Sequence, residues 1–575
     1  MTGTMKGRFI FAGGTLIAAM LGLGVRLAFL HLGGHGEIRL KIARTRHVNR
    51  KILPGRGDIY DRTGPEAPPL ALNLDVKHVC VDPHVIVEND TVDQVAVECA
   101  RILGIPAASL IPRLTDENRR FEYVKRFVRE PAARRLERRK LQGVFFRDAT
   151  ARYYPNGSFL CHVLGFVNHQ GVGGAGIEQY MDRYLKGSPG LLESSVDGMH
   201  RELYWHRDLW IPALAGADVY LTIDRHIQYI VEKALDSAMR EHHARGAWAV
   251  VQIPSTGEIL AMAGRPAYDL NEFRYTAPNE RLNRAIGYVY EPGSTFKVVT
   301  LSSALDAGTV KPDTVMDCEM GTWSYKGRVL RDYHPYGELT VADGIKKSSN
   351  ILHAKAALTL GDKRFYRYMR NFGIGVETGI DLPGEESGIL HPPDKWSNIS
   401  ATRIAMGQGV AVTALQMLGA VNAIANDGVI MRPYVIDHVV EEDGKVLYRN
   451  GPEEAFAPVS SETAAVMRGL LKRVTERGGT GTRAAVDGYE VCGKTGTAQK
   501  AAPGGYSDTD YVASFAGFLP ARSPRISAIV VVDEPQPLHT GGRVAGPVFR
   551  EIMEQTARYL NIAPAVGRLA SAGNP

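Results

Sequence analysis

The pattern of hydrophobic positions divides the chain into one short region and two long ones. An uncharged apolar run extends from Phe9 to Val25, and only Arg26 interrupts its continuation. The run is long enough to cross a bilayer if the arginine reaches toward the interface. Basic residues precede it, as in a signal peptide, but no small-residue cleavage site follows it. We therefore predict a cytoplasmic tail over residues 1–8 and an uncleaved transmembrane anchor over residues 9–32.

The first long region, residues 33–214, has an irregular pattern. Short apolar stretches alternate with charged ones and with turn clusters at residues 54–58 and 155–157. This pattern predicts an extended α+β domain. We place its boundary with the second long region near residues 212–217.

The second long region, residues 215–561, alternates strand and helix patterns and precedes a tail over residues 562–575. Two apolar runs at 247–253 and 258–262 flank turn residues, which predicts a β-hairpin. The pattern also predicts strands at 489–492 and 526–532, and helices at 413–424, 461–474 and 547–560. We therefore expect a mixed α/β (α+β) domain with an antiparallel sheet covered by helices.

Composition and charge narrow the class of protein. The 575 residues are 44% hydrophobic and 23% charged, which is typical of folded domains rather than of a disordered or polytopic membrane chain. The net charge of +6 concentrates in residues 39–56 and 119–140. Because no nucleic-acid-binding motif accompanies these runs, we interpret them as solvated faces and predict no nucleic-acid partner. The five cysteines include no C-x-x-C pair, so we predict no metal site, no cofactor and no disulfide framework.

The first candidate for chemistry is an S-x-x-K motif. Ser294 follows the turn residues Glu291-Pro-Gly and stands three residues before Lys297. On a helix, residues three apart share a face, so the Lys297 amine can reach the Ser294 hydroxyl. A serine hydroxyl needs an adjacent base, and a lysine amine becomes one when burial and a nearby cation lower its pKa. The motif alone is weak evidence, because it occurs by chance in most chains of this length.

Two later motifs strengthen the case. Ser348 and Asn350 form S-x-N on a predicted helix, where a hydroxyl and a carboxamide can relay a proton and hold a substrate amide. The segment 493–498, G-K-T-G-T-A, places the Lys494 cation and two hydroxyls on a predicted strand. Gly496 lets another backbone approach closely, and strand N–H groups can stabilise an oxyanion.

In this order the three motifs resemble the active site of the penicillin-recognising serine enzymes. The resemblance implies that Ser294 is the acylated nucleophile, Lys297 its base, Ser348 a proton relay and Asn350 an orienting amide. It further implies that Lys494 is a catalytic residue, which binds the substrate carboxylate and modulates the relay, and that Thr495, Gly496 and Thr497 bind substrate. The N–H groups of Ser294 and Thr497 would form an oxyanion hole.

Motifs elsewhere extend the resemblance to the class B penicillin-binding proteins. They lie at 56–64, 152–157 and 173–178 in the first long region, and at 406–413 and 511–517 in the second. The spacing between Pro155 and Glu178 and the segment 479–481 are most similar to the cell-division (septal) member. The resemblance implies a transpeptidase domain over residues 215–561 and a pedestal over residues 33–214.

The implied activity is the cross-linking of peptidoglycan by a serine D,D-transpeptidase. Ser294 would attack the penultimate carbonyl of a D-Ala-D-Ala stem peptide, and an amine of a neighbouring stem would resolve the acyl-enzyme after D-Ala leaves. β-Lactams would acylate the same serine. A D,D-carboxypeptidase or β-lactamase would use water instead, and a β-lactam sensor or a non-catalytic wall scaffold are further alternatives.

The resemblance also implies a location and partners. We expect a single-pass protein of the cytoplasmic (inner) membrane with its catalytic domain on the outer, periplasmic side. The positive-inside rule disagrees, since basic residues after the span outnumber Lys6 and Arg8 before it, but long domains translocate largely regardless of charge. The expected partners are stem peptides, lipid-linked nascent strands, division proteins and a polytopic membrane glycan polymerase, contacted through residues 9–32 and Arg56–Arg62.

Overall fold

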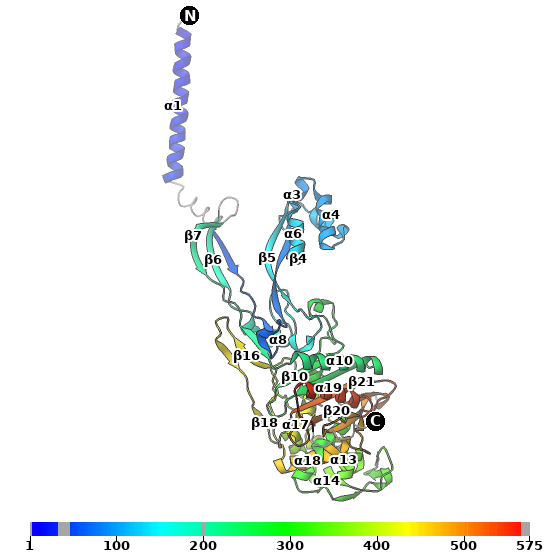
Figure 1. The fold of residues 1–575 in the computed structure, drawn as a ribbon. Coiled ribbons are helices and arrows are strands. Elements are labelled where there is room, and N and C mark those ends of the chain that lie inside the picture. The colour runs from blue at the N-terminus through cyan, green and yellow to red at the C-terminus, as the bar shows by residue number, and fades with distance from the viewer. Residues whose placement is uncertain (1–2, 33–46, 197–201, 503, 565–575) are drawn as a thin grey trace, which may run out of the picture. The chain divides into compact units, whose positions relative to one another are not determined.

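The computed structural model describes residues 3–32, 47–196, 202–502 and 504–564. These residues form two compact units, both drawn in Figure 1. The first unit contains residues 1–55 and 187–215, and the second contains residues 56–186 and 216–575. The chain therefore enters the second unit twice.

The first unit consists of one long helix and a small sheet. Helix α1 (Gly3–Leu32) contains the predicted apolar run, and its stretch Lys6–His31 is long and apolar enough to cross a membrane. Strands β1 (His47–Ile52), β6 (Gly190–Val196) and β7 (Glu202–Ile211) form an antiparallel sheet in the order β1-β6-β7.

The second unit begins with a three-stranded antiparallel sheet covered by helices. The strands lie in the order β4-β3-β5, with bounds β3 (Leu72–Val81), β4 (Glu122–Arg129) and β5 (Val144–Tyr153). The covering helices are α3 (Pro83–Glu88), α4 (Val92–Leu103), α5 (Ala107–Leu114) and α6 (Glu130–Glu137). Val79 and Val81 of β3 pack in one core with Val95 and Leu110 of the helices. Since residues two apart on a strand share a face, β3 turns this apolar pair toward the helices.

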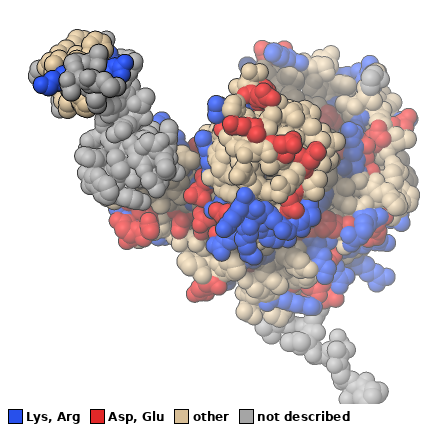
Figure 2. All heavy atoms as spheres, turned by 90° about the horizontal axis from the view of Figure 1, so that it is seen from above, with Lys and Arg blue, Asp and Glu red and all other residues tan. Residues whose placement is uncertain are grey.

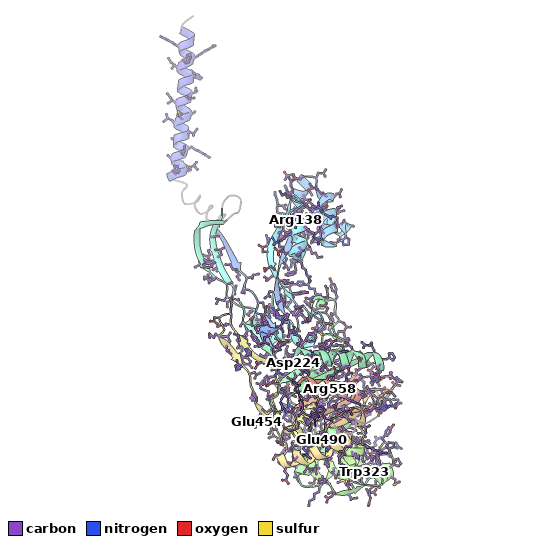
Figure 3. All side chains as sticks on the ribbon, in the orientation of Figure 1. Arg138, Asp224, Trp323, Glu454, Glu490 and Arg558 are labelled. Carbon is purple, nitrogen blue, oxygen red and sulfur yellow. The ribbon has the colours of Figure 1, made fainter. Side chains whose placement is uncertain are left out.

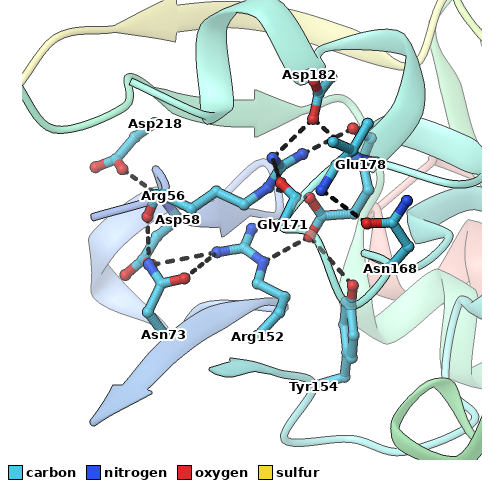
Figure 4. A network of polar contacts seen from close by, with 12 residues as sticks. Arg56, Asp58, Asn73, Arg152, Tyr154, Asn168, Gly171, Glu178, Asp182 and Asp218 are labelled. Carbon is cyan, nitrogen blue, oxygen red and sulfur yellow. Dashed lines mark hydrogen bonds and ion pairs between the residues drawn. The ribbon is translucent and has the colours of Figure 1, made fainter. Parts of the chain in front are cut away.

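Motif residues of this part converge on a buried ion network, shown in Figure 4. Glu178 of α8 (Gly176–Tyr180) accepts hydrogen bonds from Arg56 Nε (2.7 Å) and Arg152 Nε (2.6 Å). Arg56 also pairs with Asp182 of α9 (Asp182–Leu185), at 2.8 Å. The network thus ties three separate segments of the sequence together.

The central sheet of the second unit is five-stranded, antiparallel and buried on both faces. Its order is β10-β9-β21-β20-β19, with bounds β9 (Gly246–Gln252), β10 (Ile259–Arg265), β19 (Cys492–Ala502), β20 (Gly505–Leu519) and β21 (Ile526–Asp533). Val530 packs in a core with residues of α10 (Arg225–His242) and α19 (Ala545–Tyr559). Its neighbour Val531 packs on the other face with residues of α17 (Ala414–Ala425). Burial on both faces explains why these strands are continuously apolar in the sequence.

The remaining elements surround this sheet. Helices include α7 (Cys161–Leu164), α11 (Arg284–Gly287), α12 (Lys297–Asp306), α13 (Val341–Lys347), α14 (Asn350–Leu360), α15 (Asp362–Asn371), α16 (Ser400–Ile404) and α18 (Ser461–Thr475). Two-stranded pairs are β11 (Val315–Asp317) with β14 (Glu338–Thr340), β12 (Thr322–Tyr325) with β13 (Arg328–Arg331), and β15 (Ile430–Met431) with β18 (Glu454–Phe456). A four-stranded sheet has the order β17 (Val446–Arg449), β16 (Ile436–Val440), β8 (Asp218–Leu221) and β2 (Ile59–Tyr60).

The predicted hairpin and helices are confirmed, and one strand prediction is partly wrong. β9 and β10 pair antiparallel across the predicted turn. Helix α17 begins at a capping box formed by Thr413 and Gln416, within one residue of the predicted start. However, residues 489–491 precede β19 rather than form part of it, because the Tyr489 N–H closes a turn on the Val486 carbonyl.

The basic run 119–140 lies on exposed surface among acidic side chains. Figure 2 shows Lys and Arg side chains gathered beside Asp and Glu side chains on the face seen from above. Three pairs in or next to the run are Arg119 with Glu122, Arg134 with Glu130, and Arg139 with Glu98. The last turn of α6 carries Arg134 and Arg135, where cations favour the helix dipole. Of the other basic run, residues 39–46 lie outside the described residues. All five cysteines are buried free thiols.

Candidate active site

Ser294 lies on a tight turn between the central sheet and α12. A 3-10 segment over Gly293–Phe296 leads directly into α12, so Ser294 and Lys297 occupy one helical turn. Gly293 has φ +55°, and a Cβ there would lie 2.8 Å from the Thr497 carbonyl of β19. The glycine thus permits the turn and lets it pack against the strand that carries Lys494.

Lys297 is fully buried and contacts the S-x-N motif. Its Nζ lies 2.7 Å from the Ser348 carbonyl, 2.7 Å from Asn350 Oδ1 and 3.1 Å from Ser348 Oγ. The sequence analysis expected this amine to reach the Ser294 hydroxyl. Within the described part of the chain the Ser294 hydroxyl forms no hydrogen bond, and the amine is directed to Ser348 and Asn350 instead.

The S-x-N motif lies at a break between two helices, not within the continuous helix that the pattern predicted. Helix α13 ends at Lys347 with Ser348 as its C-cap (φ +61°), and α14 begins at Asn350 with Ser349 as its N-cap. At the break the Ser348 carbonyl accepts from Lys297, and the Ser348 hydroxyl contacts both buried lysines. Within a continuous helix the carbonyl would point along the helix axis instead.

Asp332 holds this break in place, and no motif in the sequence indicated it. Its carboxylate accepts hydrogen bonds from Ser349 Oγ (2.6 Å) and from the N–H groups of Asn350 and Ile351 at the start of α14. A carboxylate at this position satisfies N–H groups that have no partner inside the helix. Asp332 lies 17 positions before Ser349, the N-cap serine. An acidic residue at that separation is not a local helix-start signal, so the sequence did not indicate the contact.

Lys494 completes the cluster from the central sheet. Its fully buried Nζ lies 2.9 Å from Ser348 Oγ and 3.1 Å from the Thr495 carbonyl. A Cβ on Gly496 would lie 2.2 Å from Ser514 Oγ and 3.0 Å from the Pro292 backbone oxygen, so both a side chain and another backbone approach this glycine closely.

Two hydroxyls beside Lys494 are held by residues outside the segment 493–498, namely Thr480 of the segment 479–481 and Gly541. The Thr495 and Thr480 hydroxyl oxygens lie 3.0 Å apart, and Thr497 Oγ1 accepts the N–H of Gly541 at 3.0 Å. The segment 479–481 was noted in the sequence, but its contact with Thr495 across 15 positions was not. Gly541 lies 44 positions from Thr497, so no local pattern indicated it.

Burial disfavours the charged form of both lysine amines. Burial lowers the pKa of Lys297 to about 7, partly opposed by the negative charge of Asp332. Burial also lowers the pKa of Lys494 well below its ordinary value, and the charge of Lys297 lowers it further. An amine with a pKa near 7 can accept a hydroxyl proton at neutral pH. Among the described residues no group of His, Cys, Asp or Glu is placed to hold a metal ion.

Two protein-family models match this chain. The penicillin binding protein transpeptidase domain matches residues 247–554, and the penicillin-binding protein dimerisation domain matches residues 51–221. Stage V sporulation protein D of Bacillus subtilis is 34% identical over 533 residues, covering 90% of this chain and 80% of the relative. Peptidoglycan D,D-transpeptidase FtsI of Escherichia coli is 33% identical over 565 residues, covering 97% of this chain and 92% of the relative.

A solved structure extends the likeness to three dimensions. Penicillin binding protein 3 of Mycobacterium tuberculosis, complexed with aztreonam, superposes with a TM-score of 0.69 at 28% identity, covering 90% of this chain and 98% of that one. Both domain models and relatives along nearly the full length agree, and the chain therefore belongs to the class B penicillin-binding proteins.

Proposed function

We propose that the protein is a peptidoglycan D,D-transpeptidase that acts in septal wall synthesis through an acyl-enzyme on Ser294. One observation carries the proposal: two fully buried lysine amines, Lys297 and Lys494, approach the same Ser348 hydroxyl at 3.1 Å and 2.9 Å. Such a cluster can move a proton between a nucleophile and a leaving amine. The relatives named peptidoglycan D,D-transpeptidase support the substrate.

In the proposed mechanism Ser294 Oγ attacks the penultimate carbonyl of a D-Ala-D-Ala stem. Its proton passes to Lys297, whose pKa of about 7 suits a base at neutral pH. The N–H groups of Ser294 and Thr497 stabilise the oxyanion. As the C–N bond breaks, Ser348 hands a proton to the leaving D-Ala amine and regains one from Lys297.

The substrate carboxylate is bound during acylation, and the acceptor amine reacts in the later step that resolves the acyl-enzyme. Lys494, Thr495 and Thr497 bind the terminal carboxylate, with Gly496 giving room on the strand and Gly541 N–H orienting the Thr497 hydroxyl at 3.0 Å. Asn350 orients the substrate amide. After D-Ala leaves, an amine of a neighbouring stem attacks the ester, gives its proton to Lys297 and restores the Ser294 hydroxyl.

The test is covalent labelling by fluorescent penicillin, followed by the fate of the acyl group. Ser294→Ala should abolish labelling, because it removes the only atom that forms the ester, while Ser302→Ala, a buried serine two helical turns later, should retain it. With a D-Ala-D-Ala donor and an added D-amino acid, transfer to the amine should exceed hydrolysis. Predominant hydrolysis would indicate a D,D-carboxypeptidase, and labelling of Ser294→Ala would contradict the nucleophile.

We also propose the domain limits and topology given by the pattern. They are a cytoplasmic tail over 1–8, an anchor over 9–32, a pedestal over 33–214, a transpeptidase domain over 215–561 and a tail over 562–575. The apolar helix α1 supports a single-pass anchor, and an external substrate supports a periplasmic body. A reporter active only outside the cytoplasm, fused after Asn574, should be active, and activity of a cytoplasm-only reporter there would contradict the orientation.

The partner that we propose is a polytopic glycan polymerase of the shape, elongation, division and sporulation family. Not every residue of Arg56–Arg62 can contact a partner. The side chain of Arg56 is 8% exposed and that of Asp61 is 1% exposed, and both form ion pairs within this chain. The contact then rests on the span and on Arg62, which is 35% exposed. Replacing residues 9–32 by an unrelated apolar helix should preserve penicillin labelling and impair septation. Normal septation by a span-swapped Arg62→Ala protein would contradict the partnership.

A further inference from the structure

Two arginines lie at the edge of the Ser294 site without forming an ion pair in the described part of the chain. Arg403, in α16, is half-buried, and its guanidinium donates from Nη2 to the Val329 carbonyl at 3.1 Å. Arg328, the residue before Val329, is exposed, and its positive charge lowers the pKa of Arg403. The two cations therefore share one small area of surface.

The backbone places Arg403 next to the turn that carries the nucleophile. Its carbonyl accepts the N–H of Gln408 at 3.0 Å, and the Gly407 carbonyl accepts the N–H of Gly293 at 3.1 Å. A Cβ on Gly407 would lie 2.2 Å from the Gly293 carbonyl oxygen, so the two turns are in direct contact. Arg403 is thus fixed to the loop against which the Ser294 turn packs.

The β12–β13 hairpin connects Arg403 to the S-x-N motif. Two residues after Val329, the Arg331 carbonyl accepts a hydrogen bond from Asn350 Nδ2 at 2.8 Å. The hairpin also lies against α14, since the Lys355 ammonium stands 5.2 Å from the centre of the Trp323 ring. Figure 3 labels Trp323 at this end of the second unit. Arg403 therefore connects two segments: its guanidinium contacts Val329 of β13, and its backbone belongs to the segment that packs against the Ser294 turn.

The tip of the β19–β20 hairpin is the third segment near Arg403, after β13 and α16. Tyr506 donates its hydroxyl to Glu291 Oε1 at 3.2 Å, and Glu291 stands three residues before Ser294. Tyr506 also interacts electrostatically with Arg403. Three segments far apart in the sequence, β13, α16 and this hairpin, thus meet around one guanidinium.

The electrostatics of this cluster call for an anion. Burial and the neighbouring Arg328 charge lower the pKa of Arg403, opposed by Tyr506, yet a guanidinium stays protonated in proteins. Arg403 has five N–H donors in a planar fork that suits a carboxylate, and only one hydrogen bond is recorded for them within the described residues. A partly buried cation beside a second cation is costly unless an anion binds between them.

We infer that Arg403 and Arg328 form a subsite for a carboxylate of the donor stem peptide upstream of its terminal D-Ala-D-Ala. This inference rests on the proposed function, and it adds a second anchor to the one provided by Lys494, Thr495 and Thr497. Stem peptides carry upstream carboxyl groups at the second residue and on the side chain of some third residues, and each is either free or amidated. The subsite distinguishes these forms by charge.

The test uses three synthetic donor pentapeptides and the full-length protein. One peptide has both upstream carboxyls free, one is amidated at the second residue, and one is amidated at the third. Active sites are counted by penicillin labelling, and kcat/KM is measured for D-Ala release. The wild type should favour a free carboxyl at one of the two positions by about tenfold, the effect of one charge-assisted pair.

Arg403→Gln should bring this preference to about unity. Arg328→Gln, at an exposed position, should lower the preference from about tenfold to about threefold. Arg367→Gln, an exposed arginine of α15, is the matched control and should keep the full preference. Equal wild-type rates for the three peptides, or a preference that survives both substitutions, would overturn the subsite and leave the proposed function standing. Absence of D-Ala release from every peptide would overturn both.

Discussion

Replacing Glu178 by glutamine removes the negative charge that two arginines share in the network of Figure 4. The Glu178 side chain has no exposed surface, and those of Arg56 and Arg152 are 8% and 4% exposed. After Glu178→Gln, Arg56 keeps Asp182 at 2.8 Å, whereas the carboxylate that remains near Arg152 is Asp58 at 3.8 Å. The loss of stability therefore comes mainly from the buried charge of Arg152, which is left without a close carboxylate.

The expected cost follows from the buried charge that is left behind. Breaking a buried ion pair from one side costs about 3–5 kcal/mol. Glutamine keeps the shape and one acceptor oxygen, so we take the lower end, about 3 kcal/mol. With an unfolding entropy of about 2.1 cal/mol/K per residue, Tm falls by about 3 °C if the second unit, about 490 residues, unfolds as a whole. It falls by about 11 °C if only residues 56–186, about 130 residues, unfold together.

Differential scanning calorimetry of the full-length protein measures the shift and also tells these two cases apart. Asp148→Asn is the matched control, because Asp148 is 85% exposed and lies 3.7 Å from Lys77 on the same sheet. A surface pair of this kind contributes about 0–1 kcal/mol. A Tm shift for Glu178→Gln no larger than that for Asp148→Asn would contradict a cost of about 3 kcal/mol for the buried charge.

Three further predictions concern the catalytic cluster. The rate of acylation by benzylpenicillin should rise as pH increases through about 7, since the base is the neutral Lys297 amine, and a flat stopped-flow profile between about pH 6 and 8 would contradict this. Asp332→Asn should move that midpoint to lower pH, because the Asp332 charge raises the pKa of Lys297, and an unchanged midpoint would exclude that influence. Gly496→Ala should lower acylation at least tenfold because its Cβ meets Ser514, whereas Gly469→Ala, in open space on α18, should label normally.

Sequence patterns predicted the parts of the fold and site whose signals are local. The strands around Val250 and Val530 could be recognised because a strand buried on both faces stays apolar at every position. Ser294 and Lys297 could be paired because one helical turn connects them. In both cases the neighbours that matter lie within a few positions along the chain.

The features that escaped prediction depend on contacts between distant segments. Asp332 reaches Ser349 across 17 positions, and Gly541 reaches Thr497 across 44. The break at Ser348 could not be foreseen either, because its positive φ of 61° is stabilised by Asp332 and by the lysines rather than by a glycine at that position. A non-glycine residue in this conformation is held there by its surroundings, which only the folded chain supplies.

The atoms around Ser348 also constrain where the protons lie. A neutral Lys297 amine has two N–H groups and one lone pair. Its two 2.7 Å contacts are with the Ser348 carbonyl and Asn350 Oδ1, which only accept, so they occupy both N–H groups. The lone pair is then available to a hydroxyl proton, while Lys494 donates to Ser348 Oγ at 2.9 Å. Both lysine amines contact the Ser348 hydroxyl, and this arrangement can take a proton from the nucleophile and return it to the leaving amine.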